Sequence, residues 1–134
     1  IDDDLLELAR RRVPGILFQK EDIHGLSYPD ATADLVVCLE VLEHVADQEK
    51  ALRELARGTK THAILGVPRE PLWRALNMAR GAYWKDFGNT PGHINHWSAR
   101  GFARFAEACF DVVDVATPLP WTMLFLKKRV GSPS

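Results

Sequence analysis

The sequence predicts an α/β fold whose sheet is mostly parallel and ends in an antiparallel pair of strands. The unbroken apolar run at 35–39 is typical of a parallel strand covered on both faces. Along most of the chain, short apolar runs alternate with amphipathic helical patterns, as in α/β proteins. Near the C-terminal end, the strand-like segments 112–116 and 122–128 are separated only by a Pro118-Leu119-Pro120 bend. If they are neighbours, they must pair antiparallel.

The composition favours one globular domain over residues 1–134. Of its residues 46% are hydrophobic and 26% are charged, and 17 basic against 18 acidic residues give a net charge of −1. This balance excludes the basic footprint of nucleic-acid or anionic-membrane binding, and the apolar runs are too short to span a bilayer. Cys38 and Cys109 lie in apolar patterns and are expected to be buried thiols. We therefore expect a cytoplasmic protein with no nucleic-acid and no membrane partner.

The first half of the chain predicts two helices and two strands. Acidic residues precede an i, i+3, i+4 apolar pattern at Leu5, Leu8 and Ala9, which predicts a helix over 2–12 with one buried face. Segments 16–18 and 34–39 are the expected strands. Asp47 is a suitable N-cap for a helix over 48–57.

The second half predicts a strand at 63–67, a helix at 70–81 and a helix after Ser98. Residues 81–97 form a long loop, and loops of this length in compact domains are usually functional or mobile. The inward residues of the 70–81 helix are expected to be Leu72, Trp73, Leu76 and Ala79. Those of the last helix are expected to be Phe102, Phe105, Ala106 and Cys109.

Four stretches resemble the class I S-adenosylmethionine-dependent methyltransferases, in their small-molecule, methyltransferase type 11-like form. They are Asp22-Ile23-His24-Gly25-Leu26-Ser27-Tyr28-Pro29-Asp30, Ala33-Asp34-Leu35-Val36-Val37, Glu40-Val41-Leu42-Glu43-His44-Val45, and the Gly-His-x-Asn-x-Trp-Ser loop at 92–98. The resemblance covers essentially the whole chain. It implies a Rossmann-like sheet, S-adenosylmethionine as cofactor, and methyl transfer to an O, N or C atom of a small molecule.

The chain departs from the family pattern at its start. In the family, a glycine-rich loop follows the first strand. Neither the strand nor the loop occurs in this sequence, because it begins at Ile1, directly before the first predicted helix. We therefore expect an N-terminally incomplete domain whose missing strands would leave a gap in the sheet between 16–18 and 35–39. A fragment of this kind is expected to be inactive in isolation, and to form homo-oligomers or exchange segments between copies.

The resemblance implies a set of cofactor-binding residues. Asp22 would accept a hydrogen bond from the adenine amino group, and the backbone N–H of Ile23 would contact the ring. Cys38, Leu39 and Glu40 would pass under the methionine part of the cofactor. In the family an acidic residue binds the cofactor ribose, and Asp2 is a weaker candidate for this role. The structural alternatives are that Asp22 caps local backbone groups and that Cys38 and Leu39 are ordinary core residues.

Three histidines are candidate general bases, because imidazole titrates near neutral pH. They are His44, His93 and His96, and structural hydrogen bonding is the alternative for each. No metal site is predicted. The pair His93-x-x-His96 is not followed by a Cys or acidic residue at ligand spacing, and Glu40 occupies the first position of the H-x-x-E-H pattern.

Two other classes of protein remain as alternatives. A non-catalytic Rossmann-like binding or pseudo-enzyme domain would use the aromatic 81–97 loop to hold its partner. A nicotinamide-dependent enzyme is the third reading, and the antiparallel C-terminal strands count against it.

Overall fold

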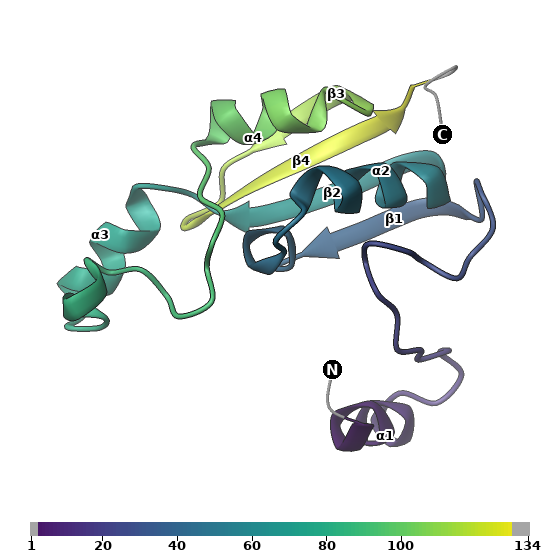
Figure 1. Cartoon of the computed structure of the whole chain (residues 1–134), viewed down its shortest axis with the longest axis horizontal. Helices are drawn as coiled ribbons and strands as arrows, with labels where there is room; N and C mark the ends of the chain where they lie inside the picture. The colour runs from purple at the N-terminus through teal and green to yellow at the C-terminus, as the bar shows by residue number, and fades with distance from the viewer. Residues whose placement is uncertain (1–2, 130–134) are drawn as a thin grey trace.

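The computed structural model describes residues 3–129 and contains a four-stranded sheet with the order β1-β2-β4-β3 (Figure 1). Strand β1 (Ala33–Leu39) pairs parallel with β2 (Thr59–Pro68). Strand β4 (Trp121–Lys128) pairs antiparallel with β2 and with β3 (Phe110–Ala116). The predicted α/β class and the antiparallel C-terminal pair are confirmed. The described sheet is mixed, since only β1 and β2 run parallel.

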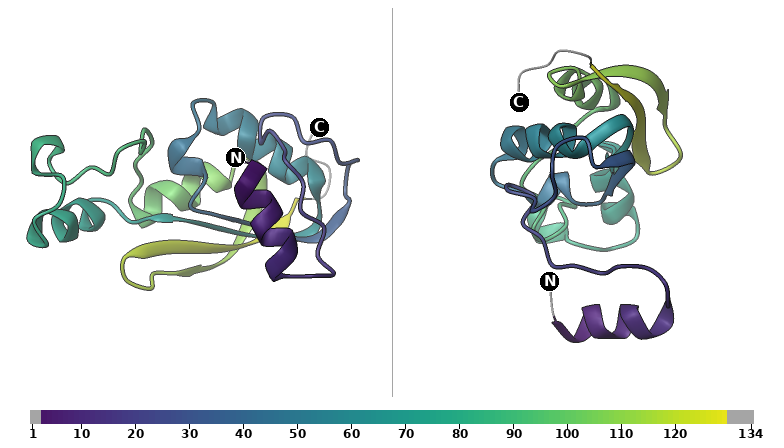
Figure 2. Two further views of the ribbon diagram at one scale, coloured as in Figure 1. Left: turned by 90° about the horizontal axis from the view of Figure 1, so that it is seen from below. Right: turned by 90° about the vertical axis from the view of Figure 1, so that its right-hand side faces the viewer.

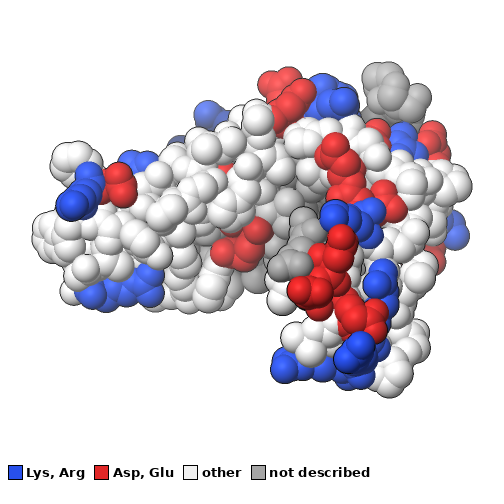
Figure 3. Space-filling view, turned by 60° about the horizontal axis from the view of Figure 1, so that its bottom comes forward, with Lys and Arg blue, Asp and Glu red and all other residues white. Residues whose placement is uncertain are grey.

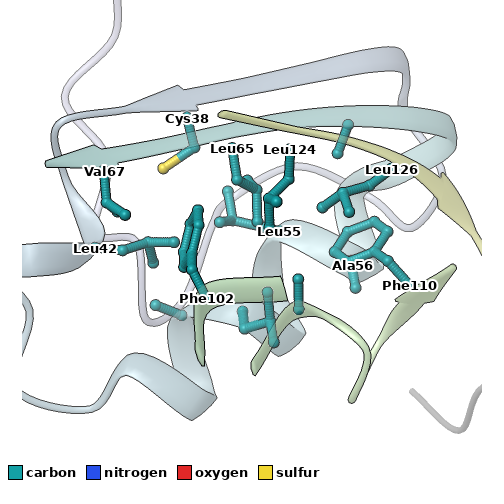
Figure 4. Close-up of a cluster of buried hydrophobic side chains, with 14 of the residues drawn as sticks. Cys38, Leu42, Leu55, Ala56, Leu65, Val67, Phe102, Phe110, Leu124 and Leu126 are labelled. Atoms are coloured by element: carbon teal, nitrogen blue, oxygen red, sulfur yellow. The ribbon is translucent and has the colours of Figure 1, made fainter. Parts of the chain in front are cut away.

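Helices α2 (Gln48–Gly58) and α4 (Ala99–Ala106) cover one face of this sheet, and the hydrophobic core lies between them and the strands (Figure 4). Phe102 of α4 is fully buried beneath the strands. Alternate residues of β2 and β4 point into this core, as period-two patterning requires. They are Ala63, Leu65, Val67, Leu124 and Leu126.

The predicted N-cap of α2 is confirmed, because the Asp47 carboxylate accepts a hydrogen bond from the Lys50 N–H at 2.9 Å. Replacing Asp47 by alanine should lower the free energy of unfolding by about 1 kcal/mol, since it removes the partner of an orphan helix N–H. Urea denaturation measures this change. Asp47→Ser retains a capping oxygen and should stay close to wild type; equal losses in both variants would contradict a capping role.

Strand β1 differs from its predicted environment. Only Cys38 is buried, whereas Leu35, Val37 and Leu39 are 49%, 54% and 46% exposed. The apolar run predicted cover on both faces, and that expectation is wrong for the described structure. No helix within residues 3–129 covers the second face of β1, so its apolar side chains remain partly open to solvent (Figure 1).

Helix α1 (Asp3–Arg12) forms where the sequence predicts it, but it stands apart from the sheet (Figure 2). It contains no buried residue, so the predicted inward face of Leu5 and Leu8 is wrong. The strand predicted at 16–18 is also wrong, because these residues form a bend and irregular coil with Leu17 78% exposed. An apolar stripe or a β-prone run forms a buried element only where a surface or a strand accepts it, and residues 3–129 supply neither here.

Helix α3 (Leu72–Ala79) and the short helix η2 (Trp84–Asp86) project beyond the carboxyl end of β2 (Figure 1). Two of the four inward positions predicted for this helix, Leu76 and Ala79, are exposed. Asn77 is buried instead, and its Nδ2 donates to the Gly88 carbonyl at 2.8 Å. The helix packs against the 81–97 loop through partly polar contacts, and its Trp73 also lies beside Trp121 at the start of β4.

The surface carries mixed charge. On the face shown in Figure 3, acidic and basic side chains intermingle and do not gather into one basic patch. None of the helices between residues 3 and 129 combines the length and the apolar character needed to cross a bilayer.

Candidate functional site

An open hollow of about 440 Å³ lies between the 21–26 segment and the free edge of β1. Three of the predicted cofactor residues, Ile23, Cys38 and Leu39, line it. The remaining lining residues are Glu21, Leu26, Val37, Val41 and Leu55. Its wall is therefore largely apolar, which suits a planar organic ring.

An ion pair on α2 holds the 21–26 segment in place. The Leu26 N–H donates to Glu54 Oε2 at 3.0 Å, and Arg57 Nη2 donates to the Leu26 carbonyl at 2.8 Å. Glu54 and Arg57 also bond to each other at 2.8 Å. These bonds keep the pKa of the Glu54 carboxyl below its usual value, with the side-chain bond from Arg57 as the largest cause. The 21–26 segment, which forms one side of the hollow, is thus fixed to α2, and α2 packs into the core.

The Asp22 carboxylate bonds to a residue of its own turn in this structure. Its Oδ1 accepts from the His24 N–H at 2.9 Å and lies 2.9 Å from His24 Nδ1. The bond from the His24 backbone, and next that from the His24 ring, lower the pKa of Asp22. The side chain is 74% exposed and is not part of the hollow's lining. Its contact with adenine stays a prediction, and Asp2 lies outside the described residues.

Glu40 borders a second cavity, of about 250 Å³, with Leu39, Gly66, Trp121 and Met123. Burial raises the pKa of Glu40, and a hydrogen bond from the Trp121 side chain opposes this shift. Its backbone φ of +56° lies in the left-handed region that non-glycine residues rarely adopt. No Lys or Arg within residues 3–129 pairs with it. The chain turns sharply here, directly after β1.

The 81–97 loop is fastened to the short helix η1 (Leu42–His44) that follows β1. The Ile94 and Asn95 N–H groups donate to the Glu43 carbonyl at 2.9 and 3.1 Å. Asn95 Nδ2 donates to the carbonyls of Leu42 at 3.0 Å and Val45 at 2.7 Å. These bonds bring together two segments that are far apart in the sequence.

Two of the three predicted bases meet at this junction. The ring centroids of His44 and His93 lie 4.8 Å apart in an edge-to-face arrangement. Burial, followed by the charge of His44, lowers the pKa of His93, so this imidazole is neutral at pH 7 and able to accept a proton. His96 is engaged elsewhere, with its Nε2 at 3.0 Å from Arg74 Nη2 and 2.8 Å from Asn89 Oδ1.

An aromatic row, Trp121–Trp73–His93, connects the second cavity with the histidine pair. Its ring centroids are 6.2 Å apart for Trp121 and Trp73 and 6.0 Å apart for Trp73 and His93. The sequence predicted Trp73 as an inward residue of a helix and left Trp121 between the Pro118-Leu119-Pro120 bend and the strand at 122–128. Their shared position at one edge of the sheet depends on tertiary structure, so no local pattern indicated it.

The family model described as "Methyltransferase domain" matches residues 1–67. A probable S-adenosylmethionine-dependent methyltransferase of Mycobacterium tuberculosis strain H37Rv is 33% identical over 66 residues, which are 49% of this chain and 24% of that protein. The ubiquinone/menaquinone biosynthesis C-methyltransferase of Cronobacter sakazakii is 31% identical over 91 residues, which are 62% of this chain and 36% of that protein. The chain thus spans about a quarter to a third of the length of these relatives.

The fold is also that of solved methyltransferases. The magnesium protoporphyrin IX methyltransferase of Synechocystis, crystallised with bound SAH, superposes with a TM-score of 0.68 and 15% sequence identity. The superposition covers 95% of this chain and 61% of that one.

Proposed function

Because the chain belongs to the methyltransferase-domain family, we propose that it takes part in S-adenosylmethionine-dependent methyl transfer. The observation that carries this proposal is the convergence of Ile23, Cys38 and Leu39 on one open, apolar hollow at the carboxyl end of β1. Ligands of α/β sheets bind at this end of the strands. When bound, the cofactor would supply an activated methyl group, and the protein would align it with an acceptor.

In this proposal the adenine ring lies in the hollow against Ile23 and Leu26. The Glu54–Arg57 pair supports this position because it fixes the Leu26 backbone from both sides. Asp22 still has an oxygen that no described residue engages, and its lowered pKa keeps the carboxylate an acceptor at neutral pH. The methionine part would extend past Leu39 toward Glu40.

We propose that the methyl acceptor is a small molecule that reacts through an O, N or C atom. The second cavity and the aromatic row favour an acceptor of modest size with a flat or apolar body. His93 would take up the acceptor's proton whenever its ring nitrogen holds no cation, because its imidazole is neutral. Cys38 and Cys109 are free thiols, which favours a cytoplasmic location.

Calorimetric titration with S-adenosylhomocysteine tests the proposal. Ile23→Asp places a charge in the wall of the hollow and should weaken binding at least about tenfold, since a buried unpaired carboxylate is costly. Ile16→Asp is the matched control, because Ile16 is 58% exposed and lies outside the hollow. Wild-type affinity in the Ile23→Asp protein, or equal losses in both variants, would exclude this hollow as the cofactor site.

A non-catalytic binding domain is the second candidate, and two exposed aromatic side chains favour it. Trp84 is 61% exposed and Phe87 is 76% exposed, both at η2. Such side chains commonly anchor a partner. If the protein bound no S-adenosylhomocysteine but captured a partner through these residues, this second function would replace the first.

A further inference from the structure

We propose that Glu43, His44 and His93 form a binding site for one divalent transition-metal cation, with Zn²⁺ as the best match. Their ligand atoms all lie within 4.8 Å of one another. The site follows from the side chains themselves and does not depend on the proposed methyl transfer.

Glu43 is a buried carboxyl group whose ionised form needs a cationic partner. Its residue is 1% exposed, and neither carboxylate oxygen has a hydrogen-bond partner within residues 3–129. An unpaired buried carboxylate is strongly unfavourable, and native proteins rarely leave one without a metal, a base or several donors. A cation between Glu43 and the two imidazoles would remove this cost.

His44 is already oriented as a metal ligand. Its Nδ1 lies 2.9 Å from the Gly92 carbonyl oxygen, which can only accept, so the ring proton is on Nδ1. The lone pair is therefore on Nε2, which lies 3.9 Å from Glu43 Oε1. A histidine whose second nitrogen donates to a backbone carbonyl is the usual arrangement around a bound metal.

His93 completes the set from the opposite segment. The residue is 7% exposed, and its ring nitrogens have no hydrogen-bond partner in the described part of the chain. Stacking on Trp73 and the bonds from the 92–95 segment to η1 hold the ring beside His44. By contrast, His96 presents its Nε2 to the Arg74 guanidinium, which opposes a nearby cation.

The donor set and the open position indicate the class of metal. Two imidazoles and one carboxylate are typical of Zn²⁺ and related first-row ions, with bonds of about 2.1 Å. Tetrahedral ligands at that bond length lie about 3.4 Å apart, so binding requires the widest separation to shrink by about 1.4 Å. Rotation of the more exposed His44 side chain would have to provide this shift. The His44 side chain is 44% exposed, so water or a substrate oxygen would reach a bound cation from the His44 side.

Zinc titration of metal-free protein by calorimetry tests the site, and we expect one Zn²⁺ per chain. Even outer-shell partners contribute about 10- to 100-fold to metal affinity, so loss of a ligand in Glu43→Gln or His93→Gln should weaken binding by about 100-fold or more. His96→Gln and His24→Gln are matched controls and should remain within about threefold of wild type. Circular dichroism confirms that each variant is folded.

Cobalt provides a second readout that needs no variant. Co²⁺ in a tetrahedral site of nitrogen and oxygen ligands absorbs visible light strongly, and one equivalent of Zn²⁺ should abolish this absorption. The proposal is overturned if the protein binds no Zn²⁺ with 1:1 stoichiometry. It is equally overturned if folded Glu43→Gln and His93→Gln proteins bind as tightly as wild type, or if His96→Gln weakens binding as much as His93→Gln.

Discussion

Replacing Phe102 by alanine is expected to lower the free energy of unfolding by about 3–5 kcal/mol. The side chain is fully buried and its ring packs against Trp97 and Phe105, with centroid separations of 5.4 and 6.3 Å. Alanine would leave a cavity between α4 and the sheet (Figure 4). Since domains are stable by only about 5–15 kcal/mol, much of the variant would be unfolded under mild conditions.

Urea denaturation followed by circular dichroism measures the loss. Phe87→Ala removes the same number of atoms from a ring that is 76% exposed, so its stability should stay within about 0.5 kcal/mol of wild type. A loss below about 1 kcal/mol for Phe102→Ala would mean that the core between α4 and the sheet is loosely packed or able to collapse around the gap.

Replacing Gly88 by alanine is expected to separate the 81–97 loop from α3. Gly88 has a φ of +76°, and an added Cβ would lie 2.3 Å from the Arg74 carbonyl oxygen. A left-handed backbone costs an L-residue about 1–2 kcal/mol, and the overlap with rigid helix backbone adds to this. We expect a total loss of about 2 kcal/mol or more in the stability of the projection formed by α3 and η2.

Hydrogen exchange measured by mass spectrometry resolves this effect by segment, and peptides from 72–97 should lose protection while those from β2 and α2 keep it. Gly58→Ala is the control, because nothing lies within 4 Å of its added Cβ and its φ is not in the left-handed region. At the end of α2 this alanine should leave stability unchanged or raise it by up to about 1 kcal/mol. Unchanged protection in the Gly88→Ala protein would contradict the clash.

The predicted elements that hold are those whose signals are local. Asp47 and Ser98 cap helices in the positions expected for N-cap residues, and the helical spacing of Phe102 and Ala106 does face the core. The errors concern burial. The apolar stripe of α1 and the runs at 16–18 and 35–39 have the composition of covered segments, but nothing in a local pattern states which surface will cover them.

Sequence reasoning likewise predicted one part of the candidate site and missed another. Ile23 belongs to one of the motif segments on which the family resemblance rests, and Leu39 lies between two of them; both line one hollow. The sequence also singled out His44 and His93, but as separate bases. Their approach to each other, and to the unpaired carboxylate of Glu43, depends on backbone bonds between η1 and the 92–95 segment. Metal-ligand spacing along the sequence therefore did not indicate a metal site.

The position of β4 has a consequence for the order in which the chain can acquire its structure. Strand β4 is the last described strand along the chain, but it lies inside the sheet between β2 and β3. Among the strands of residues 3–129, β3 pairs only with β4, and Leu124 and Leu126 of β4 belong to the core. During N- to C-terminal synthesis, β3 therefore has no strand to join until residues 121–128 have left the ribosome. The four-stranded sheet can form only after residues 121–128 have been translated. Until then the apolar side of α4 lacks the core contacts that β4 provides.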